Sequence, residues 1–430
     1  MGDTYAETRK AATTAVDAIA WRALRRTLAA LAIAAAFAAG ACAAGSAYVP
    51  RGDCAGFPRI DVATPAGWCV GLVARGLRFP RGLEVLAGGD ILVAEMGSWD
   101  PGRGRLSVLR KANRYARETL FARLDRPHGV AAAPDGWIYV GVAGGVFRFD
   151  PRAPASTRED VIGGGSGIPA LPTNGRHPLV AFVFDSADGL YVSVGSQSDH
   201  CEDPQGNPPD PATPCPESEG ADARGVIRRY TLRPAAGAAG AIYASGLRNG
   251  LALALHRATG TLLQGENARD GIDRSDASLS DEALPHDEIN AIERVRHYGW
   301  PYCYDDNRPS PEFPGTDCRS RKAPALLLPP HAAPLGMTID DDARLPAPFT
   351  GRLLVALHGY RANGHRILAY ALDAAGMPRA EPLALVSGWE ARRAPDARPR
   401  GTPVGVRIAP DGAVYVTEDI NGTVLRVAKP

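Results

Sequence analysis

Three groups of polar residues in the middle of this 430-residue chain are of types that could carry out chemistry. His177 stands ahead of an Asp-Gly pair, and a neutral imidazole is suited to accepting a proton near pH 7. Arg248 and Asn249 stand side by side, and a guanidinium is suited to binding carboxylates. Asp287 and Glu288 close a long insertion, and carboxylates together with the carbonyls of an irregular loop supply the hard oxygens that Ca2+ prefers. Taken singly, each of these residues would more often be an ordinary surface residue, so their setting matters.

The elements that must position these residues form an internal repeat of six units. Each unit has an apolar strand, a turn, a second apolar strand and a third strand that runs outward. In three units an Asp-Gly pair separates two β-rich runs, which is a strong hairpin signal. The units begin near Gly82, Gly129, Ala181, Leu251, Leu335 and Val404.

Six such units predict an all-β protein, a six-bladed β-propeller in which each sheet is buried against its neighbours. A decorated β-sandwich is the alternative, and the sixfold recurrence argues against it. Long insertions are expected after the third and fourth units, at about 196–223 and 266–288. Insertions of this length in a compact domain are usually functional or disordered.

The overall composition excludes several classes of protein. Gly (48) and Pro (37) are too abundant for a helical bundle and suit many short strands joined by turns. The formal net charge of +1 argues against a nucleic-acid partner. No GxGxxG sequence opens a helix after a strand, so a dinucleotide-binding domain is not expected.

The first 45 residues have the composition of a secretory targeting segment. Arg22, Arg25 and Arg26 precede the apolar run 28–39, and small residues follow it. We therefore expect residues 1–45 to be a signal peptide or lipoprotein-type segment and residues 46–430 to be the propeller. The expected location is periplasmic or on the outer surface. An uncleaved anchor, or lipid attachment at Cys42, would tether the protein to the membrane.

The cysteines agree with export to an oxidising compartment. Apart from Cys42 there are six, and they fall into three close pairs: Cys54/Cys69, Cys201/Cys215 and Cys303/Cys318. Six cysteines allow 15 connectivities, and local pairing is the simplest of them. A zinc site is the alternative, although no CxxC spacing occurs.

From about residue 75 to 428 the chain resembles the PQQ-dependent glucose, sorbosone and related sugar dehydrogenases, where PQQ is pyrroloquinoline quinone. The densest stretch of the resemblance runs from His177 to Tyr302. In the family, a His at the distance of His177 from the hairpin is the general base. The Gly-Leu-Arg248-Asn249 segment is similar to the one in which Arg and Asn contact the quinone, and Arg stabilises its reduced oxygen. Ser196 stands where the glucose enzymes have Asp.

The same resemblance implies a calcium site that holds the quinone. Backbone carbonyls after a Glu-Asn-like turn bind the ion in the family, and an Asp-Glu segment and a Tyr-Gly-Trp-Pro segment complete the region. The residues that match these segments are Asn267, Ala268, Asp287, Glu288 and Tyr298.

Matches nearer the C-terminus imply further contacts to the cofactor. The segment from Leu354 to Arg361 is similar to one in which a basic residue reaches a PQQ carboxylate. The resemblance implies that Arg361 makes this contact. Farther on, Thr402 stands where the family often has Arg, and Arg400 is the nearby residue that could substitute for it.

The sequence therefore predicts an enzyme that oxidises an aldose or a related, sorbosone-like sugar by hydride transfer to PQQ, with Ca2+ and with His177 as base. A quinone, a cytochrome or a dye would then take the electrons. Two alternatives use the same fold. One is a calcium-dependent sugar lactonase, and the other is a carbohydrate-binding propeller that has lost its cofactor.

Overall fold

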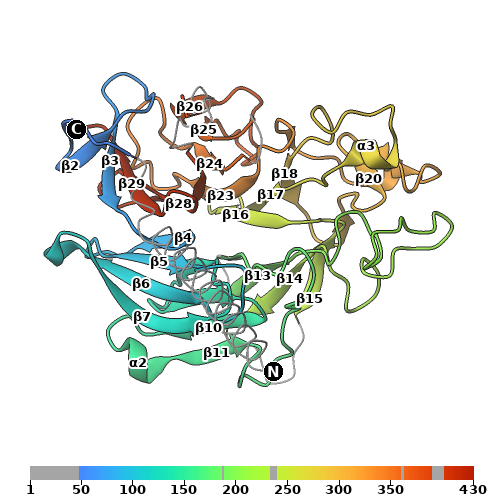
Figure 1. Ribbon diagram of the computed structural model, residues 1–430, viewed down its shortest axis with the longest axis horizontal. Helices are drawn as coiled ribbons and strands as arrows, with labels where there is room; N and C mark the ends of the chain where they lie inside the picture. The colour runs from blue at the N-terminus through green and yellow to red at the C-terminus, as the bar shows by residue number, and fades with distance from the viewer. Residues whose placement is uncertain (1–47, 186–187, 233–239, 360–362, 390–400) are drawn as a thin grey trace, which may run out of the picture. The chain divides into compact units, whose positions relative to one another are not determined.

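The structure is a computed structural model, and it describes residues 48–185, 188–232, 240–359, 363–389 and 401–430. Six sheets, whose strands are antiparallel apart from one short parallel pair, are arranged around a common centre (Figure 1). The predicted all-β, six-bladed propeller is therefore confirmed. The expected targeting segment and Cys42 lie outside the described residues, so their roles stay predictions.

The first three sheets have the following strands. The first sheet contains β4 (Pro80–Val85), β5 (Ile91–Glu95), β6 (Gly104–Arg110) and β7 (Ala116–Leu124). The second contains β8 (Val130–Ala132), β9 (Ile138–Val142), β10 (Gly145–Phe149) and β11 (Glu159–Ile162). The third contains β12 (Phe182–Phe184), β13 (Gly189–Val194), β14 (Val226–Thr231), β15 (Ala241–Ser245) and the short parallel strand β19 (Arg296–His297).

The other three sheets complete the ring. The fourth contains β16 (Gly250–His256), β17 (Thr261–Glu266), β18 (Glu288–Ile292) and β22 (Leu326–Leu327). The fifth contains β23 (Pro334–Ile339), β24 (Leu353–Leu357), β25 (Arg366–Tyr370) and β26 (Leu383–Val386). The sixth contains β27 (Pro403–Ile408), β28 (Val414–Glu418), β29 (Thr423–Ala428), β3 (Cys69–Ala74), β2 (Phe57–Ile60) and β1 (Asp53–Cys54).

First strands of neighbouring sheets contact one another around the centre, in the pairs β4 with β8, β12 with β16, β16 with β23, and β23 with β27, and contacts between β27 and β4 join the last sheet to the first. These strands approach so closely that glycine is needed at some positions. A Cβ on Gly82 would lie 2.3 Å from the carbonyl oxygen of His128 in the next sheet. A Cβ on Gly336 would lie 2.0 Å from the carbonyl oxygen of Val404. The backbone of one sheet thus rests directly on that of its neighbour.

The hydrophobic core consists of layers between neighbouring sheets. One layer packs Leu354 and Ile367 of the fifth sheet against Val406 and Leu425 of the sixth. Another packs Leu92 of the first sheet against Val140 of the second. Because every sheet has a neighbour on both faces, the alternating side chains of its strands are buried on both sides.

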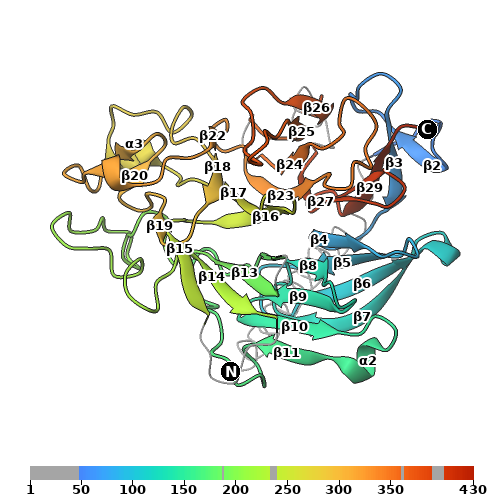
Figure 2. The same cartoon turned by 180° about the vertical axis from the view of Figure 1, so that it is seen from behind.

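The two ends of the described chain meet in the sixth sheet, which Figure 2 shows from behind. The N-terminal strand β3 pairs antiparallel with the C-terminal strand β29, with Val70 opposite Val427. A disulfide between Cys54 and Cys69 ties β1 to β3. This pairing closes the ring of sheets through backbone hydrogen bonds.

The strand directions determine which loops meet at one end of the propeller. Neighbouring strands of a sheet run in opposite directions, so the segment that leads into the first strand lies at the same end as the segment that leaves the second. His177 precedes β12 and Arg248 precedes β16, whereas Asn267 follows β17. The topology therefore brings these three sequence motifs to one end of the molecule.

The insertions differ in place from the sequence-based expectation. They do not follow the third and fourth units but lie inside those sheets, between β13 and β14 and between β17 and β18. The reason is that the outer strands of each sheet are formed by chain after the insertion. A further insertion between β18 and β22 was not anticipated, and it carries β20 (Cys303–Tyr304), β21 (Arg308–Pro309) and the 3-10 turn η2 (Cys318–Ser320).

All three proposed disulfides are present, and they join Cys54 to Cys69, Cys201 to Cys215 and Cys303 to Cys318. Disulfides persist in oxidising compartments, which agrees with an exported protein. The described helical segments are the short α2 (Pro154–Thr157) and α3 (Ile272–Ser275) and the 3-10 turns η1 (Lys111–Asn113) and η2. No helix in the described part of the chain has the length and apolar character needed to span a bilayer.

Candidate active site

A cavity of about 420 Å³ opens at the end of the propeller where the motifs meet. Six of the residues expected from the sequence line this cavity together: His177, Arg248, Asn249, Asn267, Ala268 and Asp287. They come from four different stretches of chain, which belong to the third and fourth sheets. The structure therefore brings the expected base, the expected guanidinium and the oxygen-rich turn around one space.

The other expected residues lie elsewhere. Glu288 and Tyr298 line a much smaller cavity of about 40 Å³ behind Arg248. Thr402 is buried, and its hydroxyl accepts a hydrogen bond from the backbone nitrogen of Ile420. Arg361 and Arg400 lie outside the described residues.

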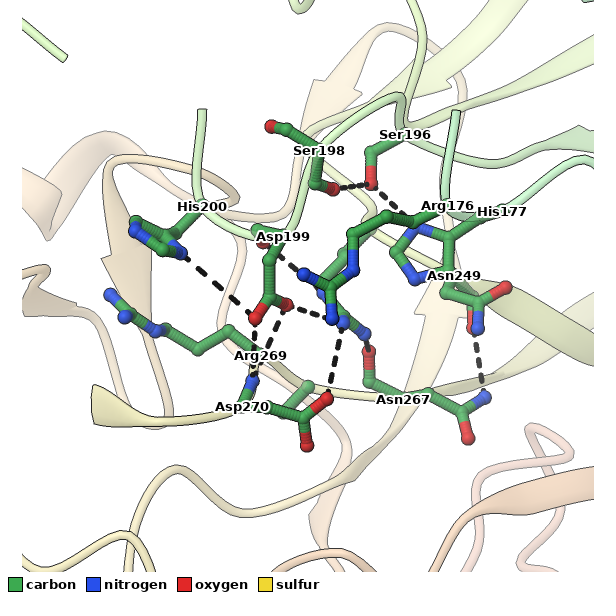
Figure 3. A network of polar contacts seen from close by, with 12 residues as sticks. Arg176, His177, Ser196, Ser198, Asp199, His200, Asn249, Asn267, Arg269 and Asp270 are labelled. Carbon is green, nitrogen blue, oxygen red and sulfur yellow. Dashed lines mark hydrogen bonds and ion pairs between the residues drawn. The ribbon is translucent and has the colours of Figure 1, made fainter. Parts of the chain in front are cut away.

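His177 is held by a short chain of hydrogen bonds that defines its protonation (Figure 3). Its Nδ1 lies 2.8 Å from Oγ of Ser196, and that oxygen lies 2.6 Å from the carbonyl oxygen of Ser198. A carbonyl can only accept, so the single hydroxyl proton of Ser196 is donated to Ser198. Nδ1 of His177 must then carry a proton and donate it to Ser196, which leaves Nε2 as the unprotonated nitrogen.

The surroundings of His177 also keep the ring neutral. Burial of the imidazole, and next the nearby positive charge of Arg248, hold the pKa of His177 well below its ordinary value. A neutral imidazole with Nε2 free is the form that can accept a proton. The side chain of His177 is therefore prepared to act as a base in the cavity that it lines.

Arg248 is buried and is fixed on three sides. Its guanidinium forms an ion pair with Asp199, and its Nη1 donates to the carbonyl oxygen of Asn267 over 2.8 Å. Its Nε donates to the backbone oxygen of Asp199 over 3.1 Å. Although burial opposes ionisation, the Arg248 charge keeps the pKa of Asp199 below its ordinary value. The positive charge at the wall of the cavity is thus present and its position is constrained.

Asp199 was not anticipated from the sequence. Figure 3 shows its carboxylate directed toward Asp270, whose backbone nitrogen donates to Oδ2 of Asp199 over 3.2 Å. The indole nitrogen of Trp300 also donates to its backbone oxygen over 2.9 Å. The sequence feature that could have indicated Asp199 is its position three residues after Ser196, at the start of a disulfide-bonded insertion.

The turn from Asn267 to Ala268 borders the cavity and is held in place by the carboxylate of Asp287. Oδ1 of Asp287 accepts from the backbone nitrogen of Ala268 over 2.8 Å, and Oδ2 accepts from that of Ala333 over 2.6 Å. Burial raises the pKa of Asp287 to about 6. Nδ2 of Asn267 donates to the carbonyl oxygen of Asn249 over 2.9 Å.

The side-chain oxygen of Asn267 is the unusual atom of this turn. Oδ1 is buried and has no hydrogen-bond partner among the described residues. Buried polar atoms are almost always satisfied, so an unpaired acceptor points to a missing donor or cation. A hard cation is suited to such an oxygen, together with neighbouring carbonyl and carboxylate oxygens.

Carboxylates alone do not form a metal cage within the described ranges. The one cluster of three or more His, Cys, Asp or Glu ligand atoms found there is Cys201, Cys215 and Glu217. Its two cysteines are joined in a disulfide, so this cluster is no metal site. A cation at the turn would depend on amide and carbonyl oxygens and on the bound ligand.

The residues of the smaller cavity support the site from behind. Oε1 of Glu266 accepts from the backbone nitrogens of Arg248 and Asn249, over 2.8 Å and 2.6 Å. Burial raises the pKa of Glu266 to about 7 and that of Glu288 well above its ordinary value. The hydroxyl of Tyr298 donates to Ala291 over 2.6 Å and accepts from Glu293 over 2.7 Å. Tyr298 therefore braces the region.

Arg81 supplies a second guanidinium on another wall of the cavity, and the sequence motifs did not indicate it. Its Nη1 donates to Oδ2 of Asp419 over 2.7 Å, and its Nε donates to Nδ1 of His128 over 3.2 Å. Nε2 of His358 lies 2.9 Å from the other oxygen of Asp419. The sequence feature that could have indicated Arg81 is its position, because it directly precedes Gly82 at the start of the first repeat.

The family model described as TrAA12-like matches residues 62–430 of this chain. No curated protein sequence matches the chain. The calcium structure of a Trichoderma reesei protein of Carbohydrate-Active Enzymes Family AA12 is 19% identical, with a TM-score of 0.67. The match covers 90% of this chain and 100% of that one.

Two further solved structures are similar to this chain. The holo form of the pyranose dehydrogenase PQQ domain from Coprinopsis cinerea is 20% identical, with a TM-score of 0.65. The match covers 87% of this chain and 99% of that one. The PQQ-bound form of aldose sugar dehydrogenase from Streptomyces coelicolor is 21% identical, with a TM-score of 0.56. The match covers 85% of this chain and 99% of that one. At these identities the structures share the fold. Together with the family match, they confirm the resemblance to PQQ-dependent sugar dehydrogenases.

Proposed function

The chain belongs to the TrAA12-like family, and we propose from this membership and from its cavity that it oxidises an aldose or related sugar with PQQ as hydride acceptor. The observation that carries the proposal is the meeting of His177, Arg248 and the Asn267 turn around one space. His177 supplies a proton acceptor, Arg248 supplies a fixed positive charge, and Asn267 supplies an oxygen atom that has no hydrogen-bond partner among the described residues.

The residues of the cavity fit an anionic quinone held by a cation. PQQ has three carboxylates, and the guanidiniums of Arg81, Arg176 and Arg248 border the cavity. The unpaired Oδ1 of Asn267, the carbonyl of Ala268 and the carboxylate of Asp287 are the oxygens that would hold Ca2+. When bound, the quinone supplies the hydride acceptor and calcium the polarisation of its carbonyl.

Further contacts to the cofactor follow from the motifs. We assign Asn249 to the quinone because it lines the cavity beside Arg248. Arg361, Arg400 and Thr402 remain assigned to the PQQ carboxylates from the family resemblance. Glu288 and Tyr298 belong to the support of the calcium region, since both line the cavity behind Arg248.

His177 moves the proton of the reaction. Its Nε2 accepts the proton of the anomeric hydroxyl as the hydride leaves the same carbon. The resulting positive imidazolium keeps its Nδ1–H bond to Ser196, so the ring does not need to reorient. Arg248 stabilises negative charge that develops on the acceptor, because its guanidinium is already fixed in a buried position.

The wider setting of the enzyme follows from the same proposal. An exported quinoprotein would pass its electrons to a quinone, a cytochrome or a dye. Residues 1–45 would direct export to the periplasm or outer surface, and Cys42 would provide a lipid tether if that cysteine is modified. A sorbosone-like sugar is within the proposed substrate range.

One experiment tests this function against its alternatives. The mature chain is loaded with PQQ and CaCl2, and dye reduction is assayed with a panel of sugars. A quinone absorbance that stays with the protein and bleaches on adding sugar is the expected result. Lactone opening that needs metal but no quinone would instead show the lactonase, and sugar binding without turnover would show a binding propeller.

A substitution tests the role of the base. His177→Ala should retain PQQ yet reduce turnover by about 10²- to 10⁴-fold, the usual contribution of a general base. His256→Ala is the matched control, because His256 lies at the other end of β16 from the cavity. Unchanged turnover in His177→Ala would refute the assignment.

A further inference from the structure

A second and larger hollow, which we call the side groove, lies next to the central cavity. Its volume is about 750 Å³. The two spaces share Arg176 and Asp270 as lining residues. The side chains of these two residues are 54% and 56% exposed, so the two spaces adjoin at partly exposed side chains. A ligand longer than one sugar ring could occupy both.

The walls of the side groove are cross-linked by two disulfides. One wall belongs to the loop closed by the Cys201–Cys215 disulfide, and another belongs to the loop closed by Cys303–Cys318. Tyr302 joins the two loops, because its hydroxyl donates to Glu219 over 2.7 Å and accepts from the backbone nitrogen of Cys215 over 2.8 Å. Both disulfides and Phe313 pack around the same tyrosine. Such preorganisation lowers the entropic cost of binding.

The lining mixes charges of both signs with apolar surface. Glu202 and Asp270 provide carboxylates, Arg176 and Arg274 provide guanidiniums, and Pro208, Pro209 and Pro311 provide apolar patches. A strongly charged ligand would meet a like charge on such a surface. Sugar hydroxyls both donate and accept hydrogen bonds, and the C–H face of a sugar ring suits an apolar wall.

Glu312 gives an independent indication of a ligand. Its side chain is only 1% exposed and borders the side groove. Oε1 accepts from Nη1 of Arg269, whereas Oε2 is buried and has no hydrogen-bond partner among the residues described. A buried carboxylate oxygen without a donor is costly, and a ligand hydroxyl at this wall would satisfy it.

We propose that the side groove binds the second unit of a disaccharide or longer oligosaccharide whose reducing-end sugar occupies the central cavity. This inference rests on the proposed function, because oxidation at the anomeric carbon places the reducing end at His177. The preferred substrate class is then an oligosaccharide with a free reducing end, and a monosaccharide uses only part of the site.

Binding measured on the chain without quinone tests the side groove independently of turnover. Calorimetry compares glucose with its α-1,4- and β-1,4-linked disaccharides. At least one disaccharide should bind about ten-fold more tightly than glucose or better. Arg274→Ala should remove about ten-fold of the disaccharide affinity, the usual effect of losing a charged hydrogen bond, and leave glucose unchanged. Arg319→Ala is the control, since Arg319 is 90% exposed and does not line the groove.

The outcomes separate this inference from the proposed function. Equal affinity for glucose and for both disaccharides, or an equal effect of Arg274→Ala on all three sugars, would overturn the side groove. Arg274→Trp, which adds bulk in the groove, repeats the test without relying on one hydrogen bond. Turnover of glucose by the PQQ-loaded chain without a disaccharide preference would leave the function standing and refute the groove. Tight disaccharide binding without turnover by the PQQ-loaded chain would support the side groove and refute the proposed function.

Discussion

Oγ of Ser196 lies 2.8 Å from Nδ1 of His177 and directs its own proton to the carbonyl oxygen of Ser198. The hydroxyl therefore fixes the tautomer of His177 without adding a negative charge beside it. Ser196 has no exposed surface, so water does not compete for this contact. The glucose enzymes of the resembled family have Asp at this position, which would orient the ring and also raise its pKa.

This relationship predicts a pH effect for Ser196→Asp. A base must be neutral to work, so activity is lost as the pH falls through the pKa of His177. That pKa is well below its ordinary value in this protein. A carboxylate at position 196 stabilises the protonated ring, so the acid limb of the kcat/KM profile should move to higher pH by about one unit or more. Profiles for both proteins check this.

The surface variant Ser278→Asp is the control for Ser196→Asp, because Ser278 is exposed and far along the chain from the base. Its profile should match that of the original protein. Superimposable profiles for Ser196→Asp and the original protein would show that the hydroxyl does not act through His177.

The buried pair of Asp199 and Arg248 predicts a loss of stability in Asp199→Ala. Removing one partner leaves an uncompensated buried charge, which costs about 3–5 kcal/mol. The free energy of unfolding from urea denaturation at pH 7 measures this. Asp222→Ala is the control, since Asp222 is exposed and should change stability by less than about 0.5 kcal/mol.

The same pair predicts the pH dependence of that loss. The pKa of Asp199 is lowered in the folded protein, so its contribution to stability is complete above the ordinary carboxyl pKa. The contribution declines as the pH falls from there toward the folded-state value. The stability difference between the original protein and Asp199→Ala should therefore shrink in acid. A difference that grows as the pH falls would contradict this account.

The unpaired Oδ1 of Asn267 predicts a calcium effect that can be measured without turnover. In the presence of PQQ, adding CaCl2 should raise the melting temperature of the original protein, and a chelator should reverse the rise. Asn267→Ala should reduce this calcium-dependent shift, because the buried oxygen is gone. Asn207→Ala, in an exposed loop, should keep the full shift. An undiminished shift in Asn267→Ala would remove this oxygen from the calcium site.

The contact between the fifth and sixth sheets predicts the outcome of Gly336→Ala. The added Cβ would lie 2.0 Å from the carbonyl oxygen of Val404, and backbone on both sides must move. Overpacking of this kind costs about 1–3 kcal/mol. Gly315→Ala is the matched control, because no atom lies within 4 Å of its added Cβ. Equal midpoints of urea unfolding for the two variants would show that the sheets can separate at little cost.

Much of the fold could be predicted because it depends on local patterns. A pair of alternating strands joined by a turn recurs in six units, and the turn is an Asp-Gly pair in three of them. Each of these patterns depends only on residues that are close together in the sequence. The three disulfides could be proposed for the same reason, since each joins cysteines 14 or 15 positions apart. The insertions were located in sequence but assigned to the wrong side of the outer strands, because short outer strands carry little pattern.

The site was predictable only where a motif carried it. His177, Arg248, Asn249, Asn267, Ala268 and Asp287 stand in motif-like segments, and the structure brings them to one cavity. Arg81 and Asp199 stand in no such segment, and their partners are distant in sequence. Arg81 pairs with Asp419, 338 positions away, through the closure of the ring. Asp199 pairs with Arg248 across the third and fourth sheets.

By itself, the sequence determined the number of sheets, the disulfide partners and the types of residue available for chemistry. The tertiary structure alone decided which of those residues share a cavity, which nitrogen of His177 is free and that a side groove adjoins it. The physical reason is that strand patterns and turns follow from interactions between near neighbours. Cavities, burial and charge pairs arise only when sheets from distant parts of the chain pack against one another.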